Sequence, residues 1–530
     1  MSRTTFNRLN AHRVYICAHC TSQLTLRHSR QYGLQSSAAP RRGVLKLLEQ
    51  RGYVNQIAGD RNALEKLLDT RRIGFYAGID PTAPSLHLGH LLPLMVLFWL
   101  YHHGHHTVSL IGGATAKVGD PSGRLTSRAK TADAVTESNF QAMHVQVGQL
   151  WQNAIRYGTR HAQDREAVGE KELLNNADWL DGLNILRFLK LMGNGMRVGT
   201  MLGRDTVRNK MEKGDGMSFS EFTYPLLQAW DWWQMHQDRG VQIQVGGSDQ
   251  YGNIIAGIDA VKYITQQSEQ SQANEHERRN MSPMGLTVPL LTSSSGEKFG
   301  KSAGNAVWLD RNLTSSFDLY GFLLRSTDDD VERYLNLFTF VLDDHIAAIM
   351  SEHKADPGKR KAQHLLASEV LELVHGPEEA TRIREEHQAM RRPTVASLTK
   401  QDAGEVDARQ AANTTQHTAL PRSLVLDATF ARILYHAGLV ASKSEGARAI
   451  SKGGAYVATS STQGTKSELN FVTIKDQRPA DIASVSSDGI LILRLGKWKV
   501  RVIKVVDDRE FKASGLEAPG WSGSKDHVHR

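Results

Sequence analysis

Three short apolar runs constrain the fold of this chain more than any other feature. Residues 73–79, 107–111 and 241–245 each have the length of a buried strand, and each leads into a polar or glycine-rich turn. Between the first two runs, the pattern of residues 87–101 indicates a helix. A strand, a crossover helix and a second strand predict a parallel α/β sheet. In such sheets ligands bind beyond the carboxyl ends of the strands, where these turns meet.

The first of these turns carries a histidine motif. Asp80 and Thr82 lead into His87-Leu-Gly-His90, at the start of the predicted helix. Backbone N–H groups and the helix dipole favour a phosphate at a helix start, and two imidazole N–H groups would add donors. Gly89 leaves room for a flat ring or a sugar against the backbone. The motif alone is weak evidence, because two helical histidines are more often structural.

A second motif has the character of a phosphate-binding loop. Gly296-Glu-Lys-Phe-Gly-Lys-Ser302 places Lys298 and Lys301 on a glycine-flanked loop that follows a serine-rich stretch. Such a loop can close over a polyphosphate and deliver two cations. A lysine-rich surface loop is normally only solvated, so this motif gains its weight from its occurrence together with the histidine motif.

The two motifs together resemble the signature of the class I aminoacyl-tRNA synthetases. Four further segments resemble the bacterial-type tyrosyl-tRNA synthetases, namely residues 76–82, 112–123, 222–231 and 244–253. The likeness covers residues from about 45 to 375 and resumes weakly from about 422. It implies a Rossmann-like parallel-sheet catalytic domain, an α-helical domain and a C-terminal S4-like α+β RNA-binding domain.

The resemblance also implies a role for each matching residue. Catalysis is implied for Thr82, His87, His90, Lys298 and Lys301. Tyrosine binding is implied for Tyr76, Asp120, Tyr224, Gln228, Asp231 and Gln250. Of these, Tyr76 and Asp231 would contact the phenolic hydroxyl. ATP binding is implied for Asp80, Gly89, Gly247, Asp249 and Lys301, and Arg124 and Arg128 are further candidates near the pyrophosphate.

The implied reaction has two steps and needs no covalent enzyme intermediate. The carboxylate of L-tyrosine attacks the α-phosphorus of ATP, and the tyrosyl group then passes to tRNA(Tyr). Mg²⁺ would accompany ATP, held chiefly by phosphate oxygens and not by a dedicated protein metal site. Two metal-like patterns are assigned no metal. Cys17 and Cys20 have no second pair, and the histidines of residues 102–106 are interpreted as a polar helix end capped by Gly104.

The charge distribution suggests targeting and a polyanionic partner. Residues 1–48 carry eight basic side chains and no acidic one, which is typical of a mitochondrial transit peptide, with a chloroplast address as the weaker alternative. We therefore expect the mature chain to start near residue 33 and to work in the mitochondrial matrix. Residues 422–530 carry 17 basic and 11 acidic side chains. A basic module on an acidic body suggests a polyanion such as RNA. The longest apolar run, residues 91–101, is too short to span a membrane.

These observations predict five segments along the chain. They are a transit peptide at 1–32, a catalytic domain at 33–338, an α-helical anticodon-side domain at 339–399, a linker at 400–421 and an S4-like domain at 422–530. The catalytic domain would include an N-terminal helical extension at 43–53 and a polar insertion at about 266–280. In the last domain two helices are expected, at 427–438 and 444–452, with phosphate contacts from Arg432, Lys443, Arg448 and Lys452.

Two alternatives stay open at this point. One is an RNA-binding group I intron splicing factor, as an additional or sole role, because some fungal members of the family use an N-terminal extension and insertions in this way. The other is a related class I enzyme for tryptophan, whose pocket would not need Tyr76 and Asp231. A homodimer is implied by the resemblance alone.

Overall fold

The computed structural model divides into two compact units, residues 1–381 and 382–530, each of which is described by itself. The described residues are 42–126, 132–161, 168–268, 282–292, 301–302, 305–391, 416–460, 469–474, 489–496, 499–514, Ala518 and Trp521. The expected transit peptide, both cysteines, Arg128, Lys298 and residues 269–280 of the expected insertion lie outside this set.

A six-stranded, mainly parallel sheet forms the centre of the first unit. Its strand order is β1-β6-β5-β2-β3-β4, and only β1 runs antiparallel to its neighbour. The strands are β1 (Gln56–Ala58), β2 (Gly74–Ile79), β3 (His106–Ile111), β4 (Glu170–Asn175), β5 (Val241–Gly247) and β6 (Met284–Val288). The three apolar runs correspond to β2, β3 and β5, which confirms the predicted parallel α/β sheet.

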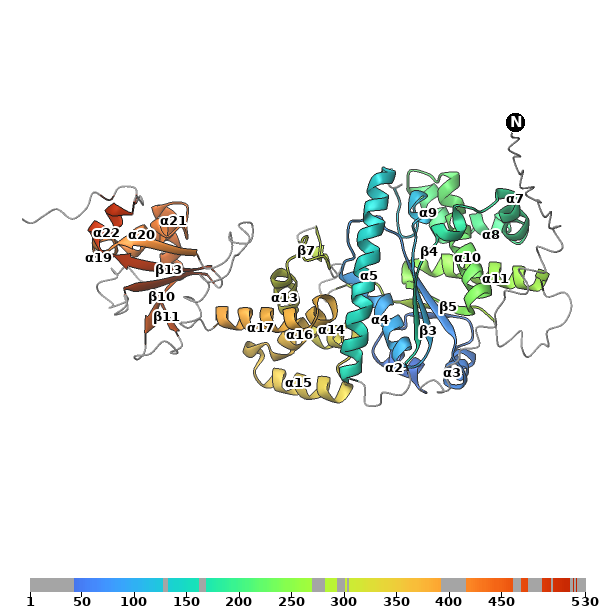
Figure 1. Ribbon diagram of the computed structural model, residues 1–530, viewed down its shortest axis with the longest axis horizontal. Helices are drawn as coiled ribbons and strands as arrows, with labels where there is room; N and C mark the ends of the chain where they lie inside the picture. Colours follow the sequence, from blue (N-terminus) through green and yellow to red (C-terminus); the bar gives the residue numbers. More distant parts are fainter. Residues whose placement is uncertain are drawn as a thin grey trace, which may run out of the picture. The chain divides into compact units, whose positions relative to one another are not determined.

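Helices cover both faces of this sheet. On one face lie α4 (Leu88–His102) and α5 (Asp133–His161), and on the other lie α10 (Phe219–Arg239) and α11 (Tyr251–Ser268) (Figure 1). Neighbouring residues of β3 show this alternation. Val108 packs in a cluster with Trp232 of α10, whereas the Ser109 hydroxyl accepts a hydrogen bond from Trp151 of α5 at 2.9 Å.

Shorter elements connect the main ones. They are η1 (Thr115–Lys117), α6 (Ala177–Leu180), α7 (Ile185–Phe188), the π-helical turn η2 (Leu189–Gly193), α8 (Val198–Leu202), α9 (Asp205–Lys213), η3 (Ser248–Gln250), β7 (Lys301–Ser302), β8 (Asn305–Ala306) and η4 (Pro357–Lys359). The stretch from α6 to α9 lies between β4 and α10 in the sequence.

A helical region follows the sheet. It comprises α13 (Ser316–Leu324), α14 (Val331–Phe338), α15 (Asp343–Ala355), α16 (Lys361–His375) and α17 (Pro377–Arg391). The Tyr320 hydroxyl of α13 hydrogen-bonds His364 Nδ1 of α16 at 2.9 Å, and Ser316 hydrogen-bonds His375 Nδ1 at the same distance. These bonds tie α13, which precedes the predicted boundary at residue 339, to a helix that follows it, and the boundary itself stays a prediction.

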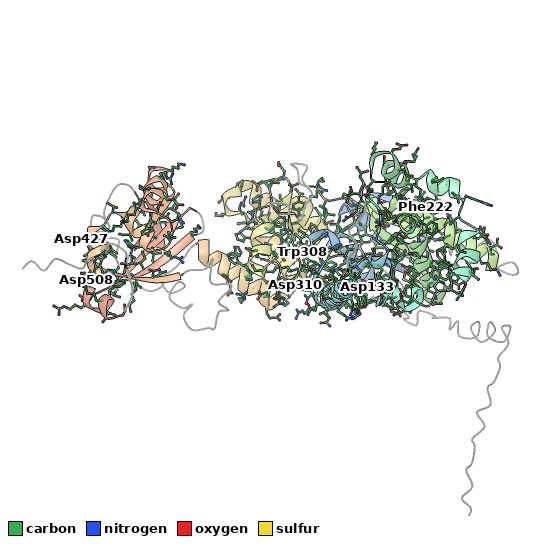
Figure 2. The ribbon with its side chains drawn as sticks, turned by 90° about the horizontal axis from the view of Figure 1, so that it is seen from above. Asp133, Phe222, Trp308, Asp310, Asp427 and Asp508 are labelled. Atoms are coloured by element: carbon green, nitrogen blue, oxygen red, sulfur yellow. The ribbon has the colours of Figure 1, made fainter. Side chains whose placement is uncertain are left out.

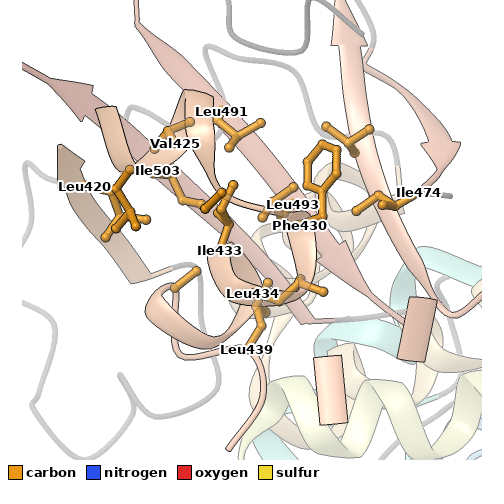
Figure 3. Packing of buried hydrophobic residues seen from close by; sticks show 14 of the residues in the cluster. Leu420, Val425, Phe430, Ile433, Leu434, Leu439, Ile474, Leu491, Leu493 and Ile503 are labelled. Carbon is orange, nitrogen blue, oxygen red and sulfur yellow. The ribbon is translucent and has the colours of Figure 1, made fainter. Parts of the chain in front are cut away.

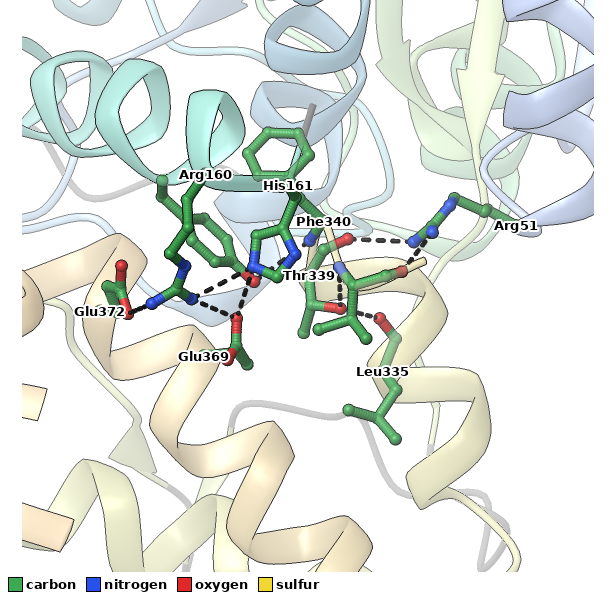
Figure 4. A network of polar contacts seen from close by, with 10 residues as sticks. Arg51, Arg160, His161, Leu335, Thr339, Phe340, Glu369 and Glu372 are labelled. Carbon is green, nitrogen blue, oxygen red and sulfur yellow. Dashed lines mark hydrogen bonds and ion pairs between the residues drawn. The ribbon is translucent and has the colours of Figure 1, made fainter. Parts of the chain in front are cut away.

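The expected N-terminal extension is a docked helix. It forms α2 (Val44–Gln50), which precedes α3 (Arg61–Thr70). After α2, the guanidinium of Arg51 donates to the carbonyls of Thr339 and Val341, and the Tyr53 hydroxyl donates to that of Leu337. Figure 4 shows Arg51 on one side of Thr339 and, on the other, a network in which Arg160 of α5 meets Glu369 and Glu372 of α16. These contacts join the start of the chain and the catalytic sheet region to the helical region.

The second unit is a small mixed sheet with helices. Its strand order is β11-β10-β12-β13-β9, with β9 parallel to β13 and the other pairs antiparallel. The strands are β9 (Gln416–Pro421), β10 (Ala455–Ser460), β11 (Leu469–Thr473), β12 (Ile490–Leu495) and β13 (Lys499–Val506), and the helices are α19 (Arg422–Asp427), α20 (Phe430–His436), α21 (Lys443–Ser451) and α22 (Asp508–Ala513). One hydrophobic core joins the helices to the sheet, with Phe430, Ile433 and Leu493 among its members (Figure 3). Because β9 belongs to this sheet, its strand occupies the end of the segment for which a linker was expected.

Candidate active site

The carboxyl ends of β2, β3 and β5 bring the sequence-predicted site residues together. Asp80 follows β2, Gly112 follows β3, and Asp249 and Gln250 follow β5. A direct contact joins the first two turns, because the Thr115 hydroxyl donates to Asp80 Oδ1 at 2.8 Å. A Cβ atom on Gly112 would lie 1.9 Å from the same carboxylate oxygen. Glycine is therefore required for this close approach of the two turns.

The two histidines at the start of α4 orient each other. His87 is the N-cap, and its Nδ1 accepts from the backbone N–H of Gly89 at 3.1 Å. His90 Nδ1 accepts from the backbone N–H of His87, also at 3.1 Å, and the two rings stack with centroids 3.9 Å apart. Burial and the neighbouring His87 lower the pKa of His90 to about 3. In a neutral imidazole ring whose Nδ1 accepts a hydrogen bond, the hydrogen is on Nε2, so Nε2 is the donor.

The backbone N–H groups that the sequence offered to a phosphate are partly used within the motif itself. Two backbone N–H groups of the first turn, those of His87 and Gly89, are already bonded to imidazole nitrogens. The atom nearest to a Cβ placed on Gly89 is Cε1 of His87, at 3.0 Å. The absence of a side chain at Gly89 thus makes room for the capping ring.

A distant segment reaches the histidine motif through backbone pairing. β7, which contains Lys301, pairs with β8, and the chain then continues into Val307–Leu309. Leu88 N–H donates to the carbonyl of Val307 at 3.2 Å, and Leu309 N–H donates to the carbonyl of Leu86 at 2.8 Å. This pairing places the backbone of the Lys301 hairpin beside the start of α4, although more than 200 residues separate the two motifs.

α10 presents three of the predicted tyrosine-binding residues on one face. Ser218 and Glu221 form a capping box that starts the helix. Tyr224, Gln228 and Asp231 then follow at spacings of four and three residues, which puts them on the same side.

One end of the resulting site is a buried carboxylate with a buried hydroxyl near it. Asp231 accepts hydrogen bonds from Asn176 Nδ2 at 3.0 Å and from Trp179 Nε1 at 2.7 Å. Burial raises its pKa from 3.8 to about 7, although both hydrogen bonds act to lower it. The Tyr76 hydroxyl is buried and has no hydrogen-bond partner among the residues that the structure describes. Burial, and then the charge of Asp231, raise its pKa. At this end the Asp231 carboxylate can accept one hydrogen bond from a ligand hydroxyl, and the Tyr76 hydroxyl can donate one to it.

The other end gathers a carboxylate and amide groups around Asn253. Gln250 Nε2 donates to Asp120 Oδ2 at 2.7 Å. Asn253 Nδ2 lies 3.1 Å from Gln228 Oε1, from Gln250 Oε1 and from Ser122 Oγ. A carboxylate beside carbonyl oxygens suits an ammonium group.

Asp80, for which the sequence predicted ATP binding, is hydrogen-bonded within the protein. Its Oδ2 accepts from the Tyr224 hydroxyl at 2.7 Å while its Oδ1 accepts from Thr115, and its role toward ATP stays a prediction. Thr115 Oγ1 in turn accepts from Asn176 Nδ2 at 2.8 Å. Asp80 therefore belongs to a buried chain of hydrogen bonds that reaches Asp231.

Sequence reasoning did not single out Asn176, Trp179 and Asn253. The first two follow β4, a strand hidden by the charged start of its Glu-Lys-Glu-Leu-Leu-Asn sequence. Had β4 been recognised as a parallel strand next to β3, the turn after it would have been expected at the same site. Asn253 lies within residues 244–253, one of the segments that carried the resemblance. Its amide contacts Gln228 and Gln250, the predicted tyrosine-binding residues, and no sequence pattern marks such a supporting residue.

Comparison with known proteins identifies the family. Residues 68–391, more than half of the chain, match the model "tRNA synthetases class I (W and Y)", and residues 408–523 match "Tyrosyl-tRNA synthetase C-terminal domain". The chain belongs to the class I tyrosyl-tRNA synthetases. As such it is a tyrosine–tRNA ligase, and the alternative of an enzyme for tryptophan is excluded by the second match and by the relatives.

Those relatives are mitochondrial enzymes. The chain is 45% identical over 501 residues to the mitochondrial tyrosine–tRNA ligase of Podospora anserina, covering 90% of this chain and 76% of the relative. It is 35% identical to that of Drosophila melanogaster, covering 91% and 96%. A C-terminally truncated mitochondrial tyrosyl-tRNA synthetase from Aspergillus nidulans aligns with a TM-score of 0.62 at 46% identity, covering 66% of this chain and 94% of that structure.

Further candidates on the ATP side of this synthetase lie around the turns after β3 and β5. Asp249 approaches both Gly247 and Gly123, since a Cβ atom on Gly247 would be 2.4 Å from Asp249 Oδ1 and one on Gly123 would be 3.6 Å from Asp249 Cβ. Thr82 is exposed, and its backbone N–H donates to the carbonyl of Asp80 at 2.8 Å. Arg124 lies in the turn that follows Gly123, with its backbone N–H bonded to Pro121.

The histidines that end α4 have separate structural environments. His102 Nε2 contacts the carbonyl of Ala154 at 3.1 Å, His103 Nδ1 that of Trp99 at 2.7 Å, and His106 Nε2 the carboxylate of Glu172 at 2.8 Å. His105 is buried against Phe75, and Gly104 has the positive φ of a helix-terminating glycine, 91°. Across the described ranges, no group of three or more His, Cys, Asp or Glu side chains is arranged to hold a metal ion. In the same ranges no helix is both long and apolar enough to cross a membrane.

The four expected RNA contacts lie on two packed helices of the C-terminal unit. Arg432 is on α20, Lys443 and Arg448 are on α21, and Lys452 caps α21. Lys443, Arg448 and Lys452 are exposed, and Arg432 is half-buried. The helices approach closely at Gly446, where a Cβ atom would lie 2.7 Å from the carbonyl oxygen of Ala431. The basic side chains of α21 are therefore presented on a helix that is fixed to the domain core.

Proposed function

We propose that this tyrosyl-tRNA synthetase binds L-tyrosine between Asp231 and Asp120 and activates it with ATP at the start of α4. The observation that carries the proposal is the unpaired, buried hydroxyl of Tyr76 close to the buried carboxylate of Asp231. The substrate's phenolic hydroxyl pairs with both groups. Phenylalanine leaves them without partners in a buried site, which is costly.

The ammonium group of the substrate lies at the opposite end. Asp120 supplies the negative charge, and Gln228 and Gln250 supply amide oxygens, held together by Asn253. Tyr224 lines the pocket from α10, with its hydroxyl bonded to Asp80. Because tyrosine is bound at its phenol and at its ammonium group, its carboxylate is directed toward the ATP.

The chemistry is an in-line displacement. A tyrosine carboxylate oxygen bonds to the α-phosphorus, the bond from this phosphorus to the bridging oxygen breaks, and pyrophosphate leaves with that electron pair. The Nε2–H groups of His87 and His90 donate to phosphate oxygens, with Thr82, Lys298 and Lys301 as further contacts. Gly247 and Asp249 contact the nucleoside. The tRNA terminal hydroxyl then attacks the carbonyl carbon of tyrosyl-adenylate, which releases AMP.

Mg²⁺ enters this scheme with ATP. We propose that phosphate oxygens hold it, because Mg²⁺ at nucleotide sites retains water and phosphate ligands and seldom uses an all-protein cage. When bound it neutralises charge on the phosphates.

The C-terminal unit supplies the RNA side of the reaction. We propose that it is S4-like and that the exposed Lys443, Arg448 and Lys452 contact phosphates of tRNA(Tyr). Its net positive charge, over a body of net negative charge, supports this assignment. We propose the domain order predicted from the sequence, in which this unit, residues 422–530, follows the catalytic domain at 33–338 and the helical domain at 339–399.

We further propose a homodimer in the mitochondrial matrix. Large apolar side chains are exposed on the consecutive elements α7, α8, α9 and the start of α10, namely Ile185, Leu186, Val198, Met211 and Phe219. Phe219, at 81% exposure, is the most exposed of them. Exposed apolar residues gathered in one stretch of chain are typical of an interface.

Intron splicing stays a prediction from the sequence. α2 buries Val44, Leu45 and Leu48, and the contacts of Arg51 tie it to the helical region, so the proposed extension has a structural role. Residues 269–280 of the proposed insertion lie outside the described residues.

ATP–pyrophosphate exchange tests the central proposal. Each amino acid is supplied in turn to the full chain and to a form that lacks residues 1–32. Exchange with tyrosine and none with phenylalanine supports the proposed pocket, and charging of tRNA(Tyr) by the same preparation supports the second step. A folded preparation that binds RNA but exchanges with no amino acid would favour the splicing factor instead.

A further inference from the structure

In the segment after the lysine loop, Trp308 is the residue that pairs directly with His87. Trp308 forms an antiparallel β-bridge with His87. The flanking backbone hydrogen bonds, from Leu88 to Val307 and from Leu309 to Leu86, make this a non-hydrogen-bonded pair. In such pairs the side chains stand closest together.

The ring of His87 has an aromatic neighbour besides His90. It stacks on His90 with centroids 3.9 Å apart and planes 18° apart. Its centroid lies 6.2 Å from the ring of Trp308, with planes 49° apart. The hydrogen bond from Gly89 N–H to Nδ1 holds one edge of the His87 ring. The indole of Trp308 is an aromatic neighbour that limits the orientations open to this ring.

Trp308 is itself well anchored. Its backbone N–H donates to the Thr314 hydroxyl at 3.0 Å. On its C-terminal side, the carbonyl of Leu309 is contacted by His375 Nε2 at 2.9 Å, and the N–H of Asp310 donates to Ser85 Oγ at 3.2 Å. In Figure 2, Trp308 and Asp310 are labelled where the helical region adjoins the catalytic part of the fold. These contacts fix the backbone at Trp308, from which the indole extends beside His87.

We propose that Trp308 is a positioning residue that sets the orientation of the His87 ring toward the α-phosphate. The inference rests on the proposed function, since it assumes that His87 donates to phosphate. Trp308 has no contact with Asp231, Asn253 or Tyr76 in the described contacts, so its effect falls on the chemical step and not on tyrosine binding.

A double-mutant cycle between Trp308 and His87 tests the inference. The variants are Trp308→Ala, His87→Ala and the double variant, and the readouts are the single-turnover rate of tyrosyl-adenylate formation and the dissociation constant of tyrosine. We expect Trp308→Ala to lower the rate about 10-fold with unchanged tyrosine affinity, because small misplacements of a catalytic group are costly. In the His87→Ala background the same change should lower the rate less than about 2-fold, because coupled residues are not additive.

Conservative and surface variants complete the design. Trp308→Phe keeps an aromatic ring and should restore most of the rate, which also covers the case in which Trp308→Ala does not fold. Leu313→Ala, on an exposed side chain of the same segment, should behave as the unchanged chain. Equal losses from Trp308→Ala with and without His87, or from Trp308→Phe and Trp308→Ala alike, would overturn the inference. An unchanged chain without tyrosine-dependent exchange would instead refute the proposed function.

Discussion

The two ends of the proposed active site are built in different ways. At the end proposed for the substrate phenol, the phenol end, Asp231 is 3% exposed and held by two side-chain donors, and the Tyr76 hydroxyl has no hydrogen-bond partner among the described residues. At the end proposed for the ATP phosphates, the phosphate end, His87 and His90 are only partly buried and are oriented by backbone N–H groups at the start of their helix. The first end is closed and preorganised in the body of the fold, whereas the second is assembled at a helix start.

This difference matches what each end has to do. Discrimination between tyrosine and phenylalanine requires polar groups that have no water to replace a missing substrate hydroxyl. The proposed phosphate chemistry requires ATP to enter and pyrophosphate to leave, which suits donors that are only partly buried. Substitutions at the two ends should therefore separate binding from chemistry.

The largest effect is expected from His90→Ala. Removing one preorganised donor to the phosphates should lower the rate of tyrosyl-adenylate formation about 10²- to 10³-fold, roughly 3–4 kcal/mol. Tyrosine affinity should change little, because His90 lies at the phosphate end. Stopped-flow measurement of adenylate formation, with tyrosine binding by equilibrium dialysis, checks both. His144→Ala, an exposed histidine of α5, is the matched control. A large loss of tyrosine affinity with unchanged chemistry would contradict the division between the two ends.

The buried carboxylate at the phenol end should make stability depend on pH. The pKa of Asp231 is raised from 3.8 to about 7 by burial. Between these values the folded protein binds a proton that the unfolded chain does not. The stabilisation is therefore complete below about pH 4 and is lost as the pH rises toward 7, by on the order of 4 kcal/mol.

Asp231→Asn isolates this dependence. Urea unfolding of the unchanged chain and of the variant is measured from pH 4 to pH 8. As the pH rises, the unfolding free energy of the unchanged chain should fall relative to that of the variant. The change with pH carries the test, since the amide at position 231 alters the hydrogen bonds to Asn176 and Trp179 equally at every pH. Parallel pH profiles would show that Asp231 is ionised throughout and that the phenol end is less dry than its burial implies.

The parts of the fold that the sequence predicted are those with a local signal. β2, β3 and β5 are continuous apolar runs, and the helix start after Asp80 is marked by its turn, so the sheet and the position of the site were predictable. β4 was missed because its first residues are charged, and with it the role of Asn176. Pairing between segments far apart in sequence, such as His87 with Trp308, leaves no periodic trace in either segment. The hydrogen bonds from α13 to α16 are also tertiary contacts that no local pattern reveals, so the sequence did not show that these two helices are tied together.

Asn253→Ala should have a smaller effect, confined to tyrosine binding. The Asn253 amide lies within 3.1 Å of Gln228 and Gln250 oxygens, which orients both toward the proposed ammonium site. Losing such a contact should weaken tyrosine affinity by about 1–2 kcal/mol, about 10-fold, with little change in the rate at saturating tyrosine. Asn194→Ala, at an exposed asparagine, is the control. A fall in the saturated rate with unchanged affinity would place Asn253 with the phosphate end instead.

The smallest effect is expected from Tyr76→Phe, and it should have opposite signs with and without substrate. The Tyr76 hydroxyl is buried without a partner in the free protein. Its removal should leave stability unchanged or raise it by up to about 1 kcal/mol, because an unsatisfied buried hydroxyl is destabilising. With tyrosine bound, the same hydroxyl has a partner, so the variant should bind tyrosine about 1 kcal/mol less tightly and phenylalanine no less tightly than before. Urea unfolding without ligand and the ratio of tyrosine to phenylalanine affinities measure the two signs. A loss of stability in the free protein would mean that the hydroxyl already has a partner there, and the phenol end would then be less different from the phosphate end than its contacts indicate.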